Sequence, residues 1–273
     1  MMRKLLSALL CGILATAALT SCQKQIDVSS KNSPASNHEI NIDRFTDRTV
    51  PNIDLEKSDV KNFTAPQKGD KVVALKFEGY EGEVKIRFFP EYAEQGVTNF
   101  LGLAEDGYYD GVIFHRIISD FMIQGGDPDG TGRGGESLWG GKFDGGTSMD
   151  IIHAAGAVAY ANSGSTATNG SQFYIVTGQV YEEEMFGEGY PEDRKEIFKT
   201  AGGTPSLDGG YTVFGQVYDG LDIIYTIQDV ATDTTEGSSA KPQDRPIEDV
   251  VIEYMKVGEY NGEETRWFIA DYK

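Results

Sequence analysis

Apolar and polar residues follow a strand-like pattern from about Lys71 onwards. Residues 83–89 alternate apolar and charged side chains with a period of two, which is typical of a half-buried β-strand. A second apolar run at 72–77 precedes this segment, and the Gly-containing stretch 79–82 separates the two. The two runs therefore predict a β-hairpin at the start of a folded domain.

After Pro90 the apolar period changes to that of a helix. Four apolar residues fall on one helical face: Val97, Phe100, Leu101 and Ala104. Pro90 and Gly107 are residue types that favour the start and the end of a helix, so they bound this one. The apolar spacing of residues 221–225 predicts a second, shorter helix.

Further short apolar runs predict β-strands. They are 112–114, 121–123, 157–160, 173–176, 213–217 and 250–255. Many short strands, with two helices and no regular β–α alternation, favour a mainly β fold in the form of a closed antiparallel barrel. Residues 179–205 interrupt the pattern and predict an insertion. Inside it a short helix is expected at 191–200, with Pro191 at its start and Gly202 just beyond its end.

The N-terminus has the features of a targeting signal. The basic pair Arg3-Lys4 precedes the apolar stretch 5–19, which is too short for a comfortable membrane span. The run Leu19-Thr20-Ser21-Cys22 resembles a bacterial lipobox. We therefore predict a lipoprotein signal peptide at 1–21 and lipid on Cys22, with an ordinary secretory signal as the alternative.

The segment 22–66 is rich in Ser, Asn, Asp and Lys and predicts a polar linker. Lipid on Cys22 would tether the following domain to a membrane. The expected location is the cell envelope, lipid-anchored and either facing the periplasm or exposed at the surface. The other cysteine, Cys11, leaves with the signal, so the mature chain has no partner for a disulfide.

Charge and motif spacing exclude several classes of site. The chain has 24 Lys+Arg against 43 Asp+Glu, a net charge of −19, which argues against nucleic acid as a partner. The G-x-G-x-x-G at 130–135 opens no helix, so a dinucleotide site is not predicted. A calcium loop would need an acidic residue where Leu138 stands, and the three histidines lack metal-ligand spacing. His153 is predicted to be a buried, hydrogen-bonded turn residue.

Two segments carry a specific resemblance. They are Phe114-His115-Arg116-Ile117-Ile118-Ser119-Asp120-Phe121-Met122-Ile123-Gln124-Gly125-Gly126-Asp127 and Asn169-Gly170-Ser171-Gln172-Phe173-Tyr174-Ile175. Together they resemble the signature of the cyclophilins, a family of peptidyl-prolyl cis/trans isomerases. The resemblance implies a closed eight-stranded antiparallel barrel capped by two helices, over residues 67–260, with a C-terminal tail at 261–273. It also implies isomerisation of Xaa–Pro bonds without a cofactor or metal.

The same resemblance implies roles for individual residues. A group that stabilises the twisted amide accelerates rotation about an Xaa–Pro bond, and a guanidinium that donates to the prolyl nitrogen does so. In cyclophilins the Arg of Phe-His-Arg has this role, which falls on Arg116 here, with Gln124 as its support. Eight residues are then expected to bind substrate: Phe121, Met122, Ala161, Asn162, Gln172, Tyr174, Leu207 and Tyr211. The expected partners are proline-containing exported polypeptides.

Three positions depart from the family pattern. Ser206 stands where cyclosporin-sensitive members have Trp, Tyr211 where many have His, and Tyr174 where many have Phe. The missing Trp predicts weak or no cyclosporin binding. The departures also leave open a non-catalytic peptide-binding or holdase module, and a structural envelope lipoprotein is a third alternative.

Overall fold

The computed structural model describes residues 60–237 and 243–267. The predicted signal peptide, Cys22 and most of the linker lie outside these ranges. The described strands are β1 (Lys71–Phe77), β2 (Val84–Phe88), β3 (Ile113–Phe114), β4 (Arg116–Ile118), β5 (Met122–Gly125), β6 (Ala157–Tyr160), β7 (Phe173–Val176), β8 (Val213–Asp219) and β9 (Val250–Glu259). The α-helices are α1 (Pro90–Glu105), α2 (Glu192–Ala201) and α3 (Leu221–Gln228), and short 3₁₀ turns are η2 (Thr166–Thr168), η3 (Glu183–Met185) and η4 (Pro205–Leu207). None of the helices in these ranges combines the length and the apolarity that a membrane span requires.

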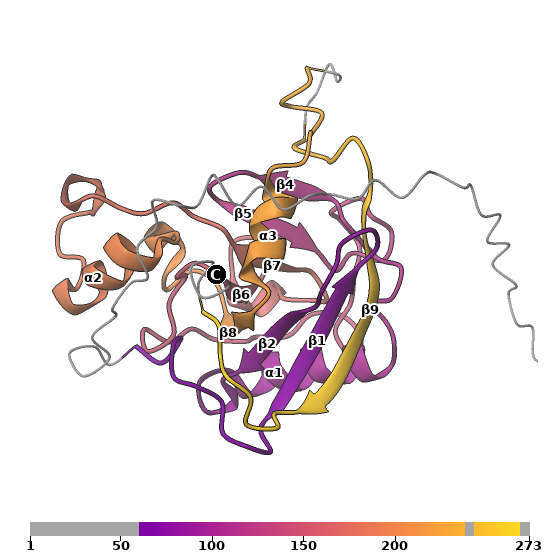
Figure 1. The fold of residues 1–273 in the computed structure, drawn as a ribbon, viewed down its shortest axis with the longest axis horizontal. Helices are drawn as coiled ribbons and strands as arrows, with labels where there is room; N and C mark the ends of the chain where they lie inside the picture. The colour runs from indigo at the N-terminus through magenta and orange to yellow at the C-terminus, as the bar shows by residue number, and fades with distance from the viewer. Residues whose placement is uncertain (1–59, 238–242, 268–273) are drawn as a thin grey trace, which may run out of the picture. The chain divides into compact units, whose positions relative to one another are not determined.

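The strands form one antiparallel sheet that is nearly closed into a barrel (Figure 1). Its order is β3-β9-β1-β2-β8-β6-β7-β5-β4. The two outer strands are consecutive in sequence and separated only by His115, so the ends of the sheet lie next to each other. The predicted fold class is therefore confirmed, but the described strands number nine rather than eight. The difference arises because the chain around His115 pairs first with β9 and then with β5.

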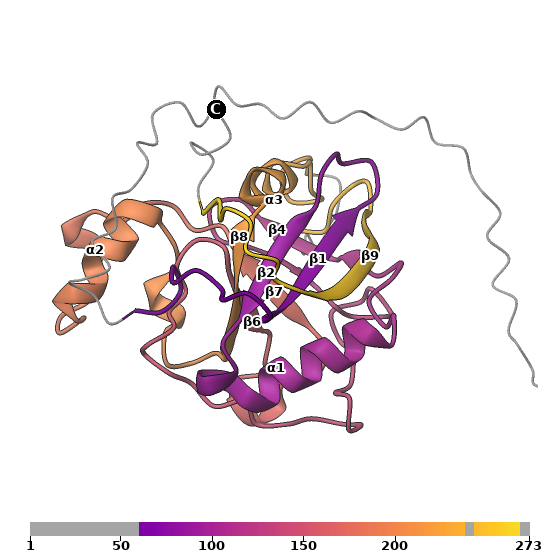
Figure 2. The same cartoon turned by 60° about the horizontal axis from the view of Figure 1, so that its bottom comes forward.

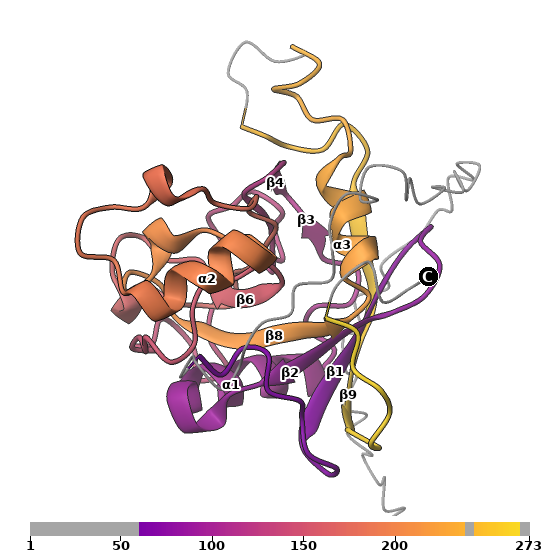
Figure 3. The ribbon, with the colours of Figure 1, turned by 60° about the vertical axis from the view of Figure 1, so that its left-hand side comes forward.

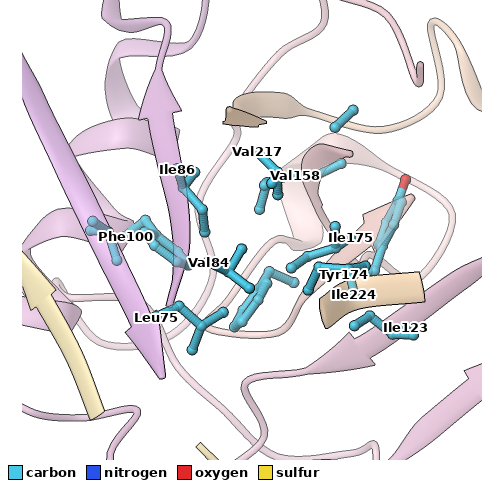
Figure 4. Close-up of a cluster of buried hydrophobic side chains, with 14 of the residues drawn as sticks. Leu75, Val84, Ile86, Phe100, Ile123, Val158, Tyr174, Ile175, Val217 and Ile224 are labelled. Carbon is cyan, nitrogen blue, oxygen red and sulfur yellow. The ribbon is translucent and has the colours of Figure 1, made fainter. Parts of the chain in front are cut away.

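The predicted hairpin sets the register of the core. Val73 pairs with Ile86 and Leu75 with Val84 across β1 and β2, and all four side chains are buried. Because side chains alternate along a strand, this register directs every second residue of both strands to the inside of the barrel. Figure 4 shows Leu75, Val84 and Ile86 in one apolar cluster with residues of the other strands, namely Val158 of β6, Ile175 of β7 and Val217 of β8.

The two predicted helices cover the two openings of the barrel (Figure 2). In α1, Phe100 and Leu103 are buried, whereas Leu101 is only partly buried against the core. Pro90 occupies the first turn of α1, where the missing N–H costs no helical hydrogen bond. In α3, Ile224 and Ile227 are fully buried and close the opposite end.

The insertion at 179–205 folds against the barrel around a second apolar cluster. As predicted, a helix (α2) follows Pro191, and Gly202 ends it with a φ of +82°. Figure 3 shows α2 and its flanking turns on one side of the sheet. The cluster consists of Val60, Phe63, Ile152, Ala154, Ile197, Phe198 and Ala201. Two of its members precede the barrel, so the described end of the predicted linker packs on the domain instead of extending from it.

The described part of the C-terminal tail also returns to the domain. The backbone N–H of Arg266 donates to the Tyr218 carbonyl at 2.6 Å. The Trp267 ring lies 5.8 Å from the Phe63 ring and 6.3 Å from the Tyr218 ring. Residues 60–66 and 261–267 therefore meet beside β8, and both contribute to the packing around the insertion.

Candidate active site

Arg116 stands on β4 directly opposite Gln124 on β5. Its side chain is 41% exposed, and its Nε lies 3.6 Å from Asp244 Oδ2. Asp244 is itself fixed, because its carbonyl accepts the Ile117 N–H at 2.8 Å and its Oδ1 accepts the Thr234 hydroxyl at 2.7 Å. The ion pair engages the Nε side of the guanidinium, while the two terminal amino groups make no hydrogen bond to a described residue.

A chain of amides supports Gln124. Its Nε2 donates to Gln172 Oε1 at 2.9 Å, and Gln172 Nε2 donates to the Gly134 carbonyl at 2.9 Å. The two hydrogen bonds fix the orientation of both amides, with the oxygen of Gln124 as the remaining acceptor. Gln124 can therefore present a carbonyl oxygen to a neighbouring cation or to an N–H group of a bound peptide.

The Gly-rich loop at 130–135 contains Gly134, whose carbonyl accepts the Gln172 amide. The buried carboxylate of Asp127 orders this loop. Asp127 accepts backbone N–H groups from Asp129, Thr131, Arg133 and Gly134. Burial acts to raise the pKa of Asp127, but these hydrogen bonds outweigh it and lower the pKa. A β-carbon at Gly134 would collide with this carboxylate. Packing against Asp127 thus explains Gly134, whereas a β-carbon at Gly130 would meet Ile113 and one at Gly135 would meet Ser171.

Nine of the ten predicted site residues line one small cavity of about 130 Å³. They are Arg116, Phe121, Met122, Gln124, Ala161, Asn162, Tyr174, Leu207 and Tyr211. The tenth, Gln172, contacts the cavity through its hydrogen bond to Gln124. The volume lies below the roughly 300–1,000 Å³ of most small-molecule sites and is on the scale of a single apolar side chain.

The walls of the small cavity come from separate parts of the fold. Met122 and Gln124 share one face of β5, as their spacing of two predicts. The rings of Tyr174 and Tyr211 meet edge to face at 5.9 Å. Asn162 both lines the cavity and fixes a turn, since its Nδ2 donates to the Gly210 carbonyl at 3.0 Å and its Oδ1 accepts the Gly164 N–H.

An adjoining cavity of about 350 Å³ shares Arg116 and Gln124 with the small one. Its other lining residues are His115, Gly130, Thr131, Gly132, Gln243, Asp244 and Arg245. Arg245 Nη1 donates to the Gly130 carbonyl at 2.7 Å. This hydrogen bond ties the loop at 243–245 to the Gly-rich loop. Burial lowers the pKa of His115, so its imidazole is neutral near pH 7. Arg116 therefore lines both cavities.

Sequence reasoning missed the residues of the 243–245 loop. Asp244 lies more than a hundred positions from Arg116 in the sequence, and no motif connects the two. The segment before β9 reads as an ordinary polar loop, and only the fold brings it to β4. A positive φ of 59° at Asp244 is visible in the structure but carries no strong sequence signal.

Comparisons with known proteins agree with this geometry. The family model described as "Cyclophilin type peptidyl-prolyl cis-trans isomerase/CLD" matches residues 72–257. A Staphylococcus aureus protein named "Putative peptidyl-prolyl cis-trans isomerase" is 44% identical over 183 residues, which are 66% of this chain and 88% of that protein. A Streptococcus pyogenes protein named "Putative bifunctional phosphatase/peptidyl-prolyl cis-trans isomerase" is 41% identical over 210 residues, which are 76% of this chain and 41% of that protein.

Solved structures point the same way. A cyclophilin-type peptidyl-prolyl cis-trans isomerase of Cryptosporidium parvum is 29% identical with a TM-score of 0.55, covering 69% of this chain and 97% of that one. The same protein in the presence of the dipeptide Ala-Pro is 29% identical with a TM-score of 0.54, covering 68% and 98%. The segment matched by the family model contains every residue that lines the small cavity.

Proposed function

The chain belongs to the cyclophilin-type peptidyl-prolyl cis/trans isomerases, and we propose that Arg116 is the residue that accelerates rotation about the Xaa–Pro bond. The barrier to this rotation is roughly 18–20 kcal/mol, because the amide has partial double-bond character. As the bond twists, the prolyl nitrogen becomes pyramidal and gains a lone pair that a guanidinium can donate to. An interaction that is stronger in the twisted state than in the planar one lowers the barrier.

The position of Arg116 at the rim of the small cavity is the observation that carries this proposal. A proline ring matches the cavity in scale, and Phe121, Met122 and Leu207 supply apolar walls for it. A ring bound there would bring its nitrogen to the polar rim, where Arg116 and Gln124 lie. The terminal amino groups of Arg116 are then available to donate, while Asp244 engages the other side of the guanidinium.

Backbone recognition would come from the amides around the cavity. Gln124 offers a carbonyl oxygen at the rim, and Ala161 and Asn162 provide an edge of chain along which a peptide can lie. Since the reaction breaks no bond, neither a nucleophile nor a proton transfer is needed. The chain's contribution is to hold the proline and to stabilise the twisted amide.

The test compares the full chain, purified in detergent, with Arg116→Ala and Arg116→Lys. Isomerisation of a short Xaa-Pro peptide is followed by exchange NMR. Loss of a donor to the twisted state is expected to lower kcat by about 10²–10³-fold, by analogy with other preorganised donors. Lys keeps the charge but not the directed donor pair, so it should restore only part of the rate. A folded Arg116→Ala protein with wild-type kcat would refute the role of Arg116.

The substrates in this proposal are exported chains that reach the envelope before they have folded. Xaa–Pro isomerisation takes tens to hundreds of seconds uncatalysed and can limit folding. Support comes from the basic start, the apolar stretch and the lipobox-like run that ends at Cys22. Cys22→Ser should abolish incorporation of labelled fatty acid and release the protein from the membrane fraction, whereas Cys11→Ser should not. Labelled fatty acid on the Cys22→Ser protein would contradict the anchor.

A further inference from the structure

A buried chain of hydrogen bonds runs from the wall of the small cavity to the insertion. The Tyr174 ring lines the cavity, and its hydroxyl lies 3.0 Å from His153 Nε2. His153 Nδ1 lies 2.7 Å from Asp208 Oδ1, and Asp208 Oδ2 accepts the Tyr190 hydroxyl at 2.5 Å. We call these four residues the His153 chain. In Figure 4 the Tyr174 hydroxyl is directed away from the apolar cluster.

Burial and geometry fix the direction of the hydrogen bonds to Asp208. The side chains of His153 and Asp208 are only 1% and 4% exposed. Asp208 Oδ1 also accepts the His153 backbone N–H at 2.8 Å, so the carboxylate receives three donors. His153 therefore donates from Nδ1 to Asp208, and its Nε2 is hydrogen-bonded to the Tyr174 hydroxyl. Burial raises the pKa of Tyr174, helped by Tyr211 and Asp208, and keeps its hydroxyl protonated.

The His153 chain connects two walls of the small cavity. Tyr174 belongs to β7, whereas Asp208 directly follows Leu207, which ends η4 and lines the cavity. A backbone hydrogen bond from the Thr204 N–H to the His153 carbonyl, at 2.8 Å, also ties the chain before η4 to His153. The separation between the Tyr174 wall and the Leu207 wall therefore depends on side-chain links as well as on the sheet.

The fourth member, Tyr190, comes from the insertion. Its ring packs on the Phe186 ring at 5.5 Å and on the Phe198 ring at 5.9 Å, at the second apolar cluster. Burial and the Asp208 charge raise the pKa of Tyr190, so this hydroxyl also keeps its proton. The insertion thus reaches the small cavity through one directed hydrogen bond.

We propose that His153, Asp208 and Tyr190 are positioning residues through which the insertion sets the width of the small cavity and so its affinity for the prolyl residue of the substrate. This inference rests on the proposed function of that cavity. It assigns a role to the insertion, which contributes none of the residues that line the cavity.

The first test is the conservative variant Tyr190→Phe in the full chain. It removes only the hydroxyl that donates to Asp208. The KM and the dissociation constant for an Xaa-Pro peptide should rise about threefold to tenfold, the effect of one lost hydrogen bond, with kcat unchanged. Tyr181→Phe is the matched control, because Tyr181 packs in the same insertion and its hydroxyl makes no hydrogen bond to a described residue. The control should bind peptide like the wild type.

A double-mutant cycle shows whether the two ends act through one chain. Tyr174→Phe alone should also weaken peptide binding. If both hydroxyls act through His153 and Asp208, the double variant should bind no more weakly than the poorer single variant. Effects that multiply, or a Tyr190→Phe protein with wild-type affinity, would overturn the proposal.

Peptide affinity is measured by NMR titration and does not require turnover. The proposed function would be refuted by a wild type that binds the peptide without isomerising it, or by an Arg116→Ala protein with full activity. The double-mutant cycle on peptide affinity could still be interpreted in either case. Conversely, the cycle can fail while Arg116→Ala loses its activity. The two proposals therefore fail on different measurements.

Discussion

The two sides of the small cavity are built in different ways. Arg116, Met122 and Gln124 stand on β4 and β5, which are paired residue for residue, so their backbone hydrogen bonds fix their relative positions. Leu207 ends the short 3₁₀ turn η4, and Tyr211 lies in a bend a few residues further along the chain. They are positioned by the His153 chain and by the contact between Tyr174 and Tyr211. We call these the strand side and the aromatic side.

The difference indicates that the two sides have different functions. A group that stabilises the twisted amide must be held accurately, and a strand pair provides this from neighbouring residues. A wall that selects substrates can be adjusted by changing one remote hydrogen bond, as on the aromatic side. We therefore expect changes on the strand side to alter kcat and changes on the aromatic side to alter affinity.

The largest expected effect is a loss of stability on substitution of Asp208, which supports the aromatic side. Asp208→Ala leaves the donors of His153 and Tyr190 buried without an acceptor, which should lower the free energy of unfolding by about 3 kcal/mol. Asp208→Asn keeps one acceptor oxygen and should lose roughly half as much. Urea unfolding measures the free energy of unfolding of both variants. If Asp208→Ala and the wild type had the same free energy of unfolding, the His153 chain would contribute nothing to the stability of the fold.

Cyclosporin affinity gives a second test of the aromatic side. Ser206 is exposed in η4 beside Leu207 and stands where cyclosporin-sensitive members have Trp. The wild type should bind cyclosporin weakly, and Ser206→Trp should tighten binding about tenfold, on the order of one aromatic contact. Ser206→Ala should leave the affinity unchanged. Tight binding by the wild type, measured by calorimetry, would show that this wall does not need the Trp.

On the strand side, Gln172→Ala removes the acceptor that orients Gln124. Without it the Gln124 amide can rotate, and kcat should fall about fivefold while peptide affinity changes less. Gln172→Glu keeps an acceptor for Gln124 and should retain more of the rate. Exchange NMR measures kcat in each variant. A rise in the peptide dissociation constant with constant kcat would place Gln172 with the binding residues instead.

The smallest expected effect concerns the ion pair at Arg116. The pair with Asp244 is partly exposed and 3.6 Å long, so it contributes little, as most surface pairs do. Asp244→Asn should lower kcat/KM about twofold to threefold through looser positioning of the guanidinium. Asp249→Asn, which breaks the Arg245 pair in the same region, is the matched control. A tenfold loss, or a gain, in Asp244→Asn would require a different role for this carboxylate.

The sequence was informative where contacts are local. The alternation in 83–89, the helical spacing of Val97 and Phe100, and the run 114–127 each predict an element or a wall from neighbouring residues. The burial of His153 was also anticipated and is confirmed. These signals reflect the strand and helix periods and one family motif, which is why most of the barrel and the ten site residues could be named.

The unpredicted parts depend on long-range contacts. Asp244 meets Arg116 across 128 positions, and the His153–Asp208 bond spans 55. Tyr190 belongs to an acidic segment whose pattern gives no indication that its hydroxyl reaches a buried carboxylate. Such pairs follow from the topology of the sheet and from how the insertion packs, neither of which a local pattern specifies.

The most direct test measures kcat by exchange NMR and the peptide dissociation constant by titration in two variants side by side. The account predicts that Arg116→Ala lowers kcat and leaves the dissociation constant near the wild-type value. It predicts that Tyr190→Phe raises the dissociation constant and leaves kcat unchanged. If both variants change the same quantity, the division between a catalytic strand side and a binding aromatic side is wrong.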